Sequence, residues 1–386
     1  MNIQTESFSA YPTYKAARKV SAAIEQHFMQ QLAAAADRGE KNLAPEPSKQ
    51  IIETIIDTTF WASLRKEEGH SPKISLAFLP PESAGKPMLF EYPLSLSAET
   101  LNKLSPAVER PGIHLGVWQH EGELYIWGTT QDIPGFCFVL EVVEPGLLVI
   151  KHRRTDGFGK FVNVAVLQGD TIKIVDDKSR WMPDCPDILH TLLGFDPSSW
   201  NKAVRLHVQL AVSMRAHGRG GILLVVPSAH EKWRDSIIQP VSYPILPAFR
   251  GLSELMAREV HEHNLPVWQD DLSEEIESIA GLTAVDGATI INDRHEVLAF
   301  GAKITRSPGR ESVKKMLITE PTVDSKPLII SPSTYGGTRH FSAAQFIYDQ
   351  RDAFALVASQ DGKFTIFTWS SCDDVVLAHR VECLLI

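Results

Sequence analysis

The chain has 386 residues, of which 44% are hydrophobic and 22% charged, and its formal net charge is −9. These values exclude wholesale disorder, collagen-like repeats and long coiled coils. The acidic balance argues against a duplex-DNA binder, so no nucleic-acid partner is expected. No apolar run reaches about 18 residues, so we expect no membrane span. Four scattered cysteines indicate free thiols and a cytoplasmic protein: Cys137, Cys185, Cys372 and Cys383.

The first part of the chain predicts helices followed by a β-rich region. Apolar residues at helical spacing predict helices over 14–38 and 48–68. From residue 74 to 177, short β-branched and aromatic runs alternate with Gly, Pro and Asp turns, which is typical of strands. One pair of runs predicts a hairpin that turns at Glu121–Gly122. We therefore expect an α+β, β-rich module over residues 1–198.

The second part predicts an α/β domain over residues 199–386, with a mixed sheet flanked by helices. Buried-strand signals alternate with helical ones, and residues 306–334 read as an irregular inserted loop. The expected helices cover 200–217, 228–237, 251–263 and 273–280, with another after residue 340. The expected strands cover 221–227, 284–291 and 296–304, and a hairpin covers 353–369.

Asp286-Gly287-Ala288 is the first candidate for chemistry, because it places a carboxylate at the apolar start of a predicted strand. A glycine at such a place admits a ligand close to the backbone, and the carboxylate can bind a divalent metal or accept a proton. An ordinary Asp-Gly turn is the alternative.

Gly336-Gly337-Thr338-Arg339-His340 leads directly into a predicted helix. The helix N-terminus, the Thr hydroxyl, the guanidinium fork and the imidazole together suit a phosphate group. The alternative is a simple helix cap, with Thr338 as the N-cap and with Arg339 and His340 in solvent. A third candidate is Ser359-Gln360-Asp361-Gly362 at the tip of the last hairpin, where Asp361 is either a second acid or a turn residue.

As an ordered set, these three elements resemble the bacterial diadenylate cyclase domain family. Asp286-Gly287-Ala288 and Gly337-Thr338-Arg339-His340 match that family's DGA and GTRH words letter for letter. The resemblance covers roughly Val204 to Ile386. The N-terminal part resembles the sensor-type modules that accompany some divergent members, which implies a small-molecule effector there.

The resemblance implies condensation of two ATP into cyclic di-AMP by a homodimer or higher oligomer with facing sites. It implies Mg²⁺ or Mn²⁺ as the cofactor, bound by Asp286 and Asp361. Asp286 would also assist deprotonation of the attacking hydroxyl, while Arg339 and His340 would stabilise charge on the phosphates. The remaining nucleotide-binding residues would be Gly287, Ala288, Gly337, Thr338 and Ser359.

One departure from the family concerns charge, because members usually carry Arg-His-Arg where this chain has Phe341 in the third position. Lys363, Arg351 and Arg294 are candidates to replace the missing cation. The departure keeps open a receptor that binds a nucleotide or cyclic dinucleotide without turnover, and a scaffold without nucleotide is a third reading. The insertion carries basic residues that could form a lid or an interface: Arg306, Arg310, Lys314 and Lys315.

Two further signals are weaker. His261-Glu262-His263 resembles a metal site, but His-x-His does not place both rings on one helical face. The basic stretch Lys151–Phe161 is typical of a solvated hairpin, and as a ligand site it would suit an anionic effector. Neither a P-loop nor a G-x-S-x-G nucleophile elbow is present.

Overall fold

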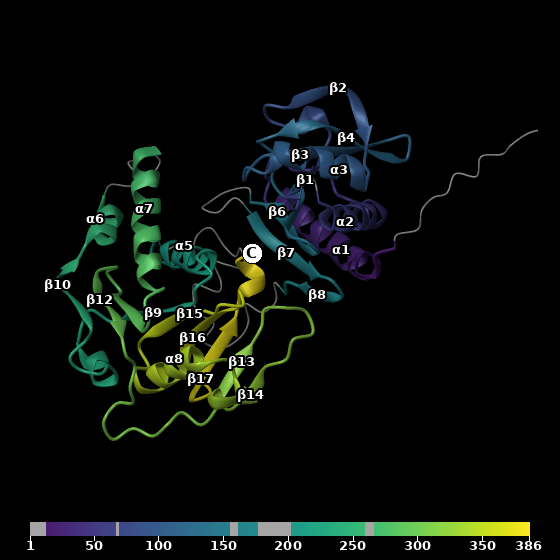
Figure 1. Cartoon of the computed structure of the whole chain (residues 1–386). Helices are drawn as coiled ribbons and strands as arrows, with labels where there is room; N and C mark the ends of the chain where they lie inside the picture. The colour runs from purple at the N-terminus through teal and green to yellow at the C-terminus, as the bar shows by residue number, and fades with distance from the viewer. Residues whose placement is uncertain (1–12, 67–68, 155–160, 177–201, 259–265) are drawn as a thin grey trace, which may run out of the picture. The chain divides into compact units, whose positions relative to one another are not determined.

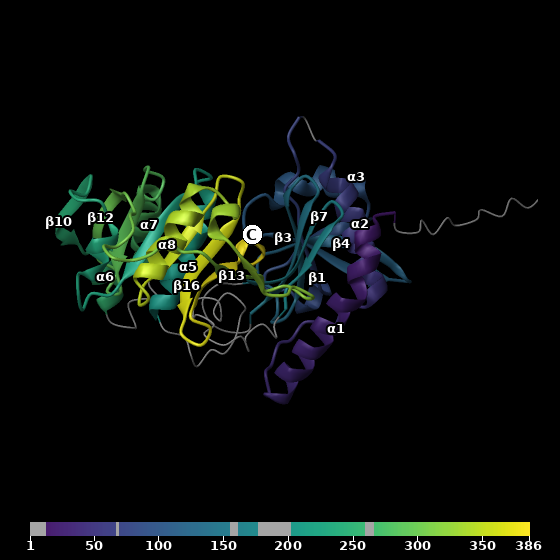
Figure 2. The same cartoon turned by 90° about the horizontal axis from the view of Figure 1, so that it is seen from below.

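The computed structural model describes residues 13–66, 69–154, 161–176, 202–258 and 266–386. The chain divides into two compact units, one up to Val175 together with Ile386 and the other from Asp176 to Leu385. The expected boundary between residues 198 and 199 lies outside the described residues. Each unit holds a mixed sheet with helices packed on it (Figures 1 and 2), which confirms the predicted mixed α/β class.

Unit 1 starts with helices α1 (Lys15–Asp37) and α2 (Lys49–Ser63), close to the two predicted. Ser48 caps α2 by accepting a hydrogen bond from the Ile51 N–H. The helix ends before the predicted residue 68, because Leu64 already forms its C-cap. A short helix that the sequence analysis missed, α3 (Ala98–Leu104), is capped by the Ser97 hydroxyl.

The described strands of unit 1 form one sheet in the order β2-β4-β3-β1-β5-β6-β7-β8. Their bounds are Ser75–Phe78 (β1), Met88–Ser95 (β2), His114–His120 (β3), Glu123–Thr130 (β4), Phe138–Glu144 (β5), Leu147–Arg153 (β6), Phe161–Gln168 (β7) and Thr171–Ile174 (β8). The predicted hairpin is confirmed: β3 and β4 pair antiparallel, and Glu121 and Gly122 between them have φ of 52° and 85°. Such left-handed pairs are typical of tight hairpin turns.

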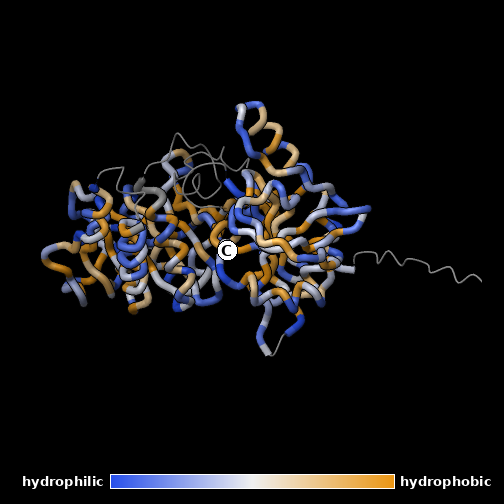
Figure 3. The backbone as a smooth tube through the Cα atoms, turned by 90° about the horizontal axis from the view of Figure 1, so that it is seen from above, coloured by the Kyte–Doolittle hydropathy of each residue, from blue (hydrophilic) through white to orange (hydrophobic). Residues whose placement is uncertain are grey.

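Successive side chains of a strand point to opposite faces of this sheet, and each face carries an apolar layer. Leu76 and Phe78 of β1 join the larger core, which α1 and α2 cover, whereas Ala77 and Leu79 join a smaller cluster around Trp127. Hydrophobic stretches of the backbone run through the interior of each unit, as Figure 3 shows.

Unit 2 holds a second sheet, whose described strands run in the order β10-β12-β11-β9-β15-β16-β17-β13-β14. Their bounds are Gly221–Val226 (β9), Tyr243–Phe249 (β10), Ala288–Asn292 (β11), Val297–Ala302 (β12), Met316–Thr319 (β13), Leu328–Ile330 (β14), Phe354–Ala358 (β15), Phe364–Ser370 (β16) and Val375–Arg380 (β17). The neighbours β9 and β11 are parallel, while β12 and β15 run antiparallel to them.

The helices of unit 2 are α5 (Lys202–Ala216), α6 (Gly251–Ala257), α7 (Pro266–Leu282) and α8 (Thr338–Asp349). The core beneath α8 combines Phe346 and Ile347 with Ile222 and Leu224 of the central strand β9. Residues 228–237, expected to be helical, form only the 3-10 turn Lys232–Ser236. None of the helices in the described ranges is long and apolar enough to cross a membrane.

The structure contains strands in two places where the sequence pattern predicts none. Strand β10 was missed because Pro244 and Pro247 interrupt its pattern, and it lies at the edge of the sheet, where prolines are tolerated. The supposedly irregular insertion contains β13 and β14, which extend the sheet beside β17. Their runs are short, so the sequence pattern alone gave no strand signal.

Candidate functional site

Asp286 and Gly287 lie just before β11 rather than inside it as predicted, because the strand begins at Ala288. Gly287 has φ of 121°, a conformation that L side chains rarely adopt. A Cβ on Gly287 would lie 2.4 Å from the carbonyl carbon of Gly301 on β12. The glycine is therefore required by the close approach of the neighbouring strand, which is a different reason from the predicted access of a ligand.

The Asp286 carboxylate is exposed and paired with a lysine that the sequence analysis did not single out. Lys303 places its Nζ 2.5 Å from Asp286 Oδ2 and 3.3 Å from the Asp286 carbonyl oxygen. The hydrogen bond and the charge of Lys303 lower the pKa of Asp286, and Arg339 contributes in the same direction. The charge of Arg339 therefore stabilises the ionised form of Asp286, so the two motifs interact electrostatically.

Helix α8 begins at Thr338, with Gly337 as its N-cap and no side-chain capping bond. The capping alternative for Thr338 is therefore wrong: its position is the first helical residue, and its hydroxyl makes no cap. Gly336 has φ of 67°, and a Cβ there would lie 2.7 Å from the ring of His340. Gly336 therefore lets the chain enter the helix directly over that ring.

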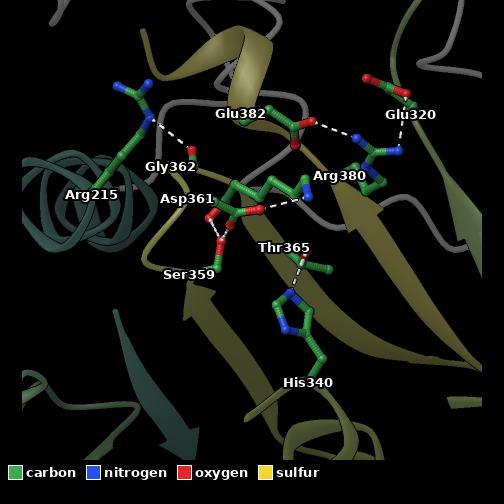
Figure 4. Close-up of polar contacts among 10 residues, drawn as sticks. Arg215, Glu320, His340, Ser359, Asp361, Gly362, Thr365, Arg380 and Glu382 are labelled. Carbon is green, nitrogen blue, oxygen red and sulfur yellow. Dashed lines mark hydrogen bonds and ion pairs between the residues drawn. The ribbon is translucent and has the colours of Figure 1, made fainter. Parts of the chain in front are cut away.

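His340 is buried, contrary to the solvated alternative, with 5% of its surface exposed. Its Nε2 lies 3.4 Å from the Thr365 hydroxyl (Figure 4). Its ring also makes T-shaped contacts with the rings of Tyr335 and Phe367. Burial lowers the pKa of His340, and the nearby cations Lys363 and Arg339 act in the same direction. At neutral pH the imidazole is therefore an uncharged hydrogen-bonding group.

The turn between β15 and β16 presents Ser359 and Asp361 side by side (Figure 4), and Lys363 of the same turn pairs with Asp361. The Ser359 hydroxyl donates to Asp361, and Lys363 Nζ lies 2.6 Å from Asp361 Oδ2. These two bonds, Lys363 first, lower the pKa of Asp361 to about 2. Arg215 of α5 donates to the Gly362 carbonyl oxygen at 3.2 Å and fixes the turn from outside.

Phe341 packs against the core of unit 2 and is not among the residues that line the site. Of the three expected replacements for its missing charge, Lys363 lines the site. Arg351 instead stacks on Trp369, with 3.8 Å from its Cζ to the ring centroid, and Arg294 does not line the site.

Arg380, at the end of β17, is a lining cation that the sequence analysis missed (Figure 4). Its Nη2 lies 2.8 Å from Glu382 and its Nη1 lies 3.7 Å from Glu320. A basic residue at the end of a strand carries no sequence signal for a site, because only the fold brings that end to the cavity.

These segments meet in one cavity of about 1090 Å³, which lies where the strands of the sheet begin or end. It is lined by the residues before β11, the end of β12, the start of α8, the turn after β15 and the end of β17. All the predicted site residues line it: Asp286, Gly287, Ala288, Gly337, Thr338, Arg339, His340, Ser359 and Asp361. Its charged side chains are the acids Asp286 and Asp361 and the cations Lys303, Arg339, Lys363 and Arg380. The excess of cations suits an anionic ligand.

The basic residues of the insertion, Arg306, Arg310, Lys314 and Lys315, do not line this cavity. The start of the insertion is instead fastened to α8 by buried hydrogen bonds. The Ser307 N–H donates to Asp349 at 2.9 Å, and the Val313 N–H donates to Gln345 at 2.9 Å. The weak metal-site signal His261-Glu262-His263 lies outside the described residues, as does the turn at 156–157.

Comparisons with known proteins bear on unit 1. A family model described as a probable sensor domain, DACNV, matches residues 41–131, and such a domain is the N-terminal domain of diadenylate cyclases. No diadenylate cyclase catalytic domain is matched, and none of the curated proteins matches significantly. A solved structure of a hypothetical membrane spanning protein from Bacillus cereus has 13% identity and covers 50% of this chain and 70% of its own. Its TM-score is 0.28, too low to support any argument.

Proposed function

We propose that unit 2 binds ATP and, as a homodimer or higher oligomer with facing sites, condenses two ATP into cyclic di-AMP or a related cyclic dinucleotide. The sensor domain in unit 1 would regulate that output. The observation that carries the proposal is the meeting of Asp286 and Arg339 in one cavity at the start of α8. A sensor domain of the kind found in diadenylate cyclases supports it independently.

The cavity has the features that a nucleoside triphosphate requires. Arg339, Lys363 and Arg380 offer cations for phosphate oxygens, and the first turn of α8 offers backbone N–H groups with the positive end of the helix dipole. His340, uncharged at neutral pH, can donate a hydrogen bond to a phosphate without adding charge. The volume of about 1090 Å³ exceeds what one small ligand needs.

The donor set fits Mg²⁺ or Mn²⁺ only in part. Within the described ranges, no group of three or more His, Cys, Asp or Glu residues is arranged to hold a metal ion. Mg²⁺ is nevertheless often bound by one or two carboxylates together with substrate phosphates, and Asp286 and Asp361 can provide them. When bound, the ion would neutralise phosphate charge and polarise the attacking hydroxyl.

The roles of the chain's own residues follow from their positions. Asp286, exposed beside β11, would accept the proton of the attacking 3′-hydroxyl, while Arg339 would hold phosphate oxygens as charge moves to the leaving pyrophosphate. Gly287 and Ala288 would let the nucleotide lie against the strand. Thr338 and Ser359 line the same cavity and would hydrogen-bond the nucleotide.

The test is incubation of the purified chain with ATP and either Mg²⁺ or Mn²⁺, followed by mass spectrometry for a cyclic dinucleotide. Asp286→Asn should abolish the product without changing the thermal midpoint, because this carboxylate is exposed and paired only at the surface. Asp324→Asn is the matched control, since it removes an acid outside the cavity. Absence of product from the wild type with either metal would defeat the enzymatic proposal.

A specific observation favours the rival function, a nucleotide or cyclic-dinucleotide receptor without turnover. Both acids of the cavity are already neutralised by lysines, Asp286 by Lys303 and Asp361 by Lys363, and no arginine stands at position 341. Calorimetry separates the two functions. Saturable nucleotide binding without product would establish the receptor, and the absence of any binding would leave only a scaffold.

A further inference from the structure

Unit 1 contains a separate cavity of about 260 Å³, and none of its lining residues belongs to the DGA or GTRH motif. Four segments line it: the loop before β2, the turn before β3, the connection from β4 to β5, and the facing ends of β6 and β7. The lining residues whose chemistry matters are Lys86, His114, Asp132, Ile133, Arg153 and Phe161.

Hydrogen bonds hold the walls of this cavity in place. The Gly85 N–H donates to the Asp132 carbonyl oxygen at 2.8 Å, and the Thr130 hydroxyl lies 2.9 Å from the carbonyl oxygens of both residues. A Cβ on Gly85 would lie 2.5 Å from the Asp132 carboxylate. Lys86 follows with φ of 53°, a left-handed conformation that lysine seldom adopts. The loop is thus fixed against the connection that follows β4.

The floor of the cavity is formed by His114, Ile133 and Phe161, of which only Phe161 is partly exposed. His114 and Ile133 are both buried, and the Phe161 ring stands edge-on to the His114 ring with 5.6 Å between centroids. His114 is oriented by Ser75, whose hydroxyl lies 2.7 Å from the ring Nδ1. The partly exposed Phe161 ring is the contact surface that an apolar or aromatic group would find here.

The rim is charged and has a small positive excess. Arg153 Nη1 lies 2.6 Å from Asp132 Oδ1, which fixes one edge of the guanidinium. Lys86, which also lines the cavity, is exposed and adds a second cation. With one acid and two cations, the rim matches a single negative charge, and a guanidinium fork pairs well with a carboxylate.

We propose that this cavity binds a small monocarboxylate with an apolar or aromatic body, and that it is the effector site of the sensor domain. Its volume is below the roughly 300–1,000 Å³ of pockets for drug-sized ligands, so a small metabolite fits and a nucleotide does not. Lys86, His114 and Gln131 lie inside the region matched by the sensor-domain model, and Asp132, Arg153 and Phe161 complete the cavity beyond it. The inference is independent of catalysis in unit 2.

The test uses the full chain and calorimetric titration at constant ionic strength. The probes are benzoate and isovalerate, with benzamide and isovaleramide as neutral analogues of the same shape and inorganic phosphate as an anion without an apolar body. At least one carboxylate should bind saturably with one site per chain, and its amide should bind at least about tenfold more weakly, because the charge-assisted bonds are lost.

Two variants and one control localise the binding. Arg153→Gln and Lys86→Gln should each weaken carboxylate binding, Arg153→Gln by about tenfold or more. Arg18→Gln removes the same charge from an exposed ion pair with Glu53 and should bind as the wild type does. Lys86 is exposed, so its variant keeps the test valid even if Arg153→Gln proves unstable in thermal unfolding.

Several results would overturn the proposal. They are no saturable binding of either carboxylate, equal binding of carboxylate and amide, and unchanged binding by both variants. Phosphate binding as tight as the carboxylate at the same residues would also refute it, since contact of the apolar body with the Phe161 ring would then contribute nothing.

Discussion

Phe341→Arg would restore the third cation of the Arg-His-Arg pattern. The structure predicts that this change lowers stability and does not improve ATP binding. The Phe341 side chain packs against the core of unit 2 and does not line the cavity. Phe341→Arg gives up about 1–2 kcal/mol of apolar burial, and bringing a guanidinium against the core costs about 1–2 kcal/mol more. The total of about 2–4 kcal/mol corresponds to a loss of roughly 4–16 °C in the thermal midpoint.

The assay pairs thermal unfolding with calorimetric titration of ATP in the presence of Mg²⁺. We expect the lower midpoint and no gain in ATP affinity. Phe341→Leu, the conservative control, should lose less than about 1.5 kcal/mol and leave ATP binding unchanged. If Phe341→Arg bound ATP tenfold more tightly at an unchanged midpoint, position 341 would reach the cavity and the reasoning would be wrong.

Three further changes test the electrostatics of unit 2. Lys303→Gln should raise the pKa of Asp286 toward its ordinary value and tighten Mn²⁺ binding a few-fold, because the cation that competes for the carboxylate is gone; weaker Mn²⁺ binding in titration would contradict this. Burial lowers the pKa of His379 from 6.5 to about 4, so the folded state binds fewer protons than the unfolded chain between those pH values. Stability should fall as the pH drops from 6.5 toward 4, by about 3 kcal/mol in full, and His379→Gln should flatten this loss in urea unfolding at pH 7 and 4.5. Asp349→Ala should destabilise the fold by about 1–3 kcal/mol in the same assay, because the buried Ser307 N–H loses its acceptor, and an unchanged midpoint would show that the insertion is not anchored there.

Local chemistry explains which elements could be predicted from the sequence. The Glu121–Gly122 hairpin follows from a glycine, which tolerates left-handed backbone, between two strand-like runs. The α8 start follows from consecutive glycines before a helical pattern, and the two words DGA and GTRH meet in one cavity as expected. Each of these features is encoded within a few residues, so reading the sequence in short windows is sufficient.

What the sequence could not supply depends on pairing between distant segments. Gly287 was interpreted as a place where a ligand approaches, yet the close neighbour is Gly301 of the adjacent strand. Strand β10 exists because β12 offers it an edge, although its prolines argue against a strand. Lys303 and Arg380 reach the cavity only because β12 and β17 end there, and nothing in their local sequence distinguishes them from surface residues.

The charge balance of the cavity is therefore a property of the sheet rather than of the motif. The sequence words contribute Asp286, Arg339 and Asp361, and the strand ends contribute Lys303 and Arg380. Both lining acids are paired with lysines, Asp286 with Lys303 and Asp361 with Lys363, and a polyphosphate bound there would compete with Asp286 for Lys303. The same cations would hold a cyclic dinucleotide without any change at the acids. On the proposed functions, enzyme and receptor would share the anion-binding residues, and the enzyme would in addition require the Asp286 carboxylate to be freed from Lys303.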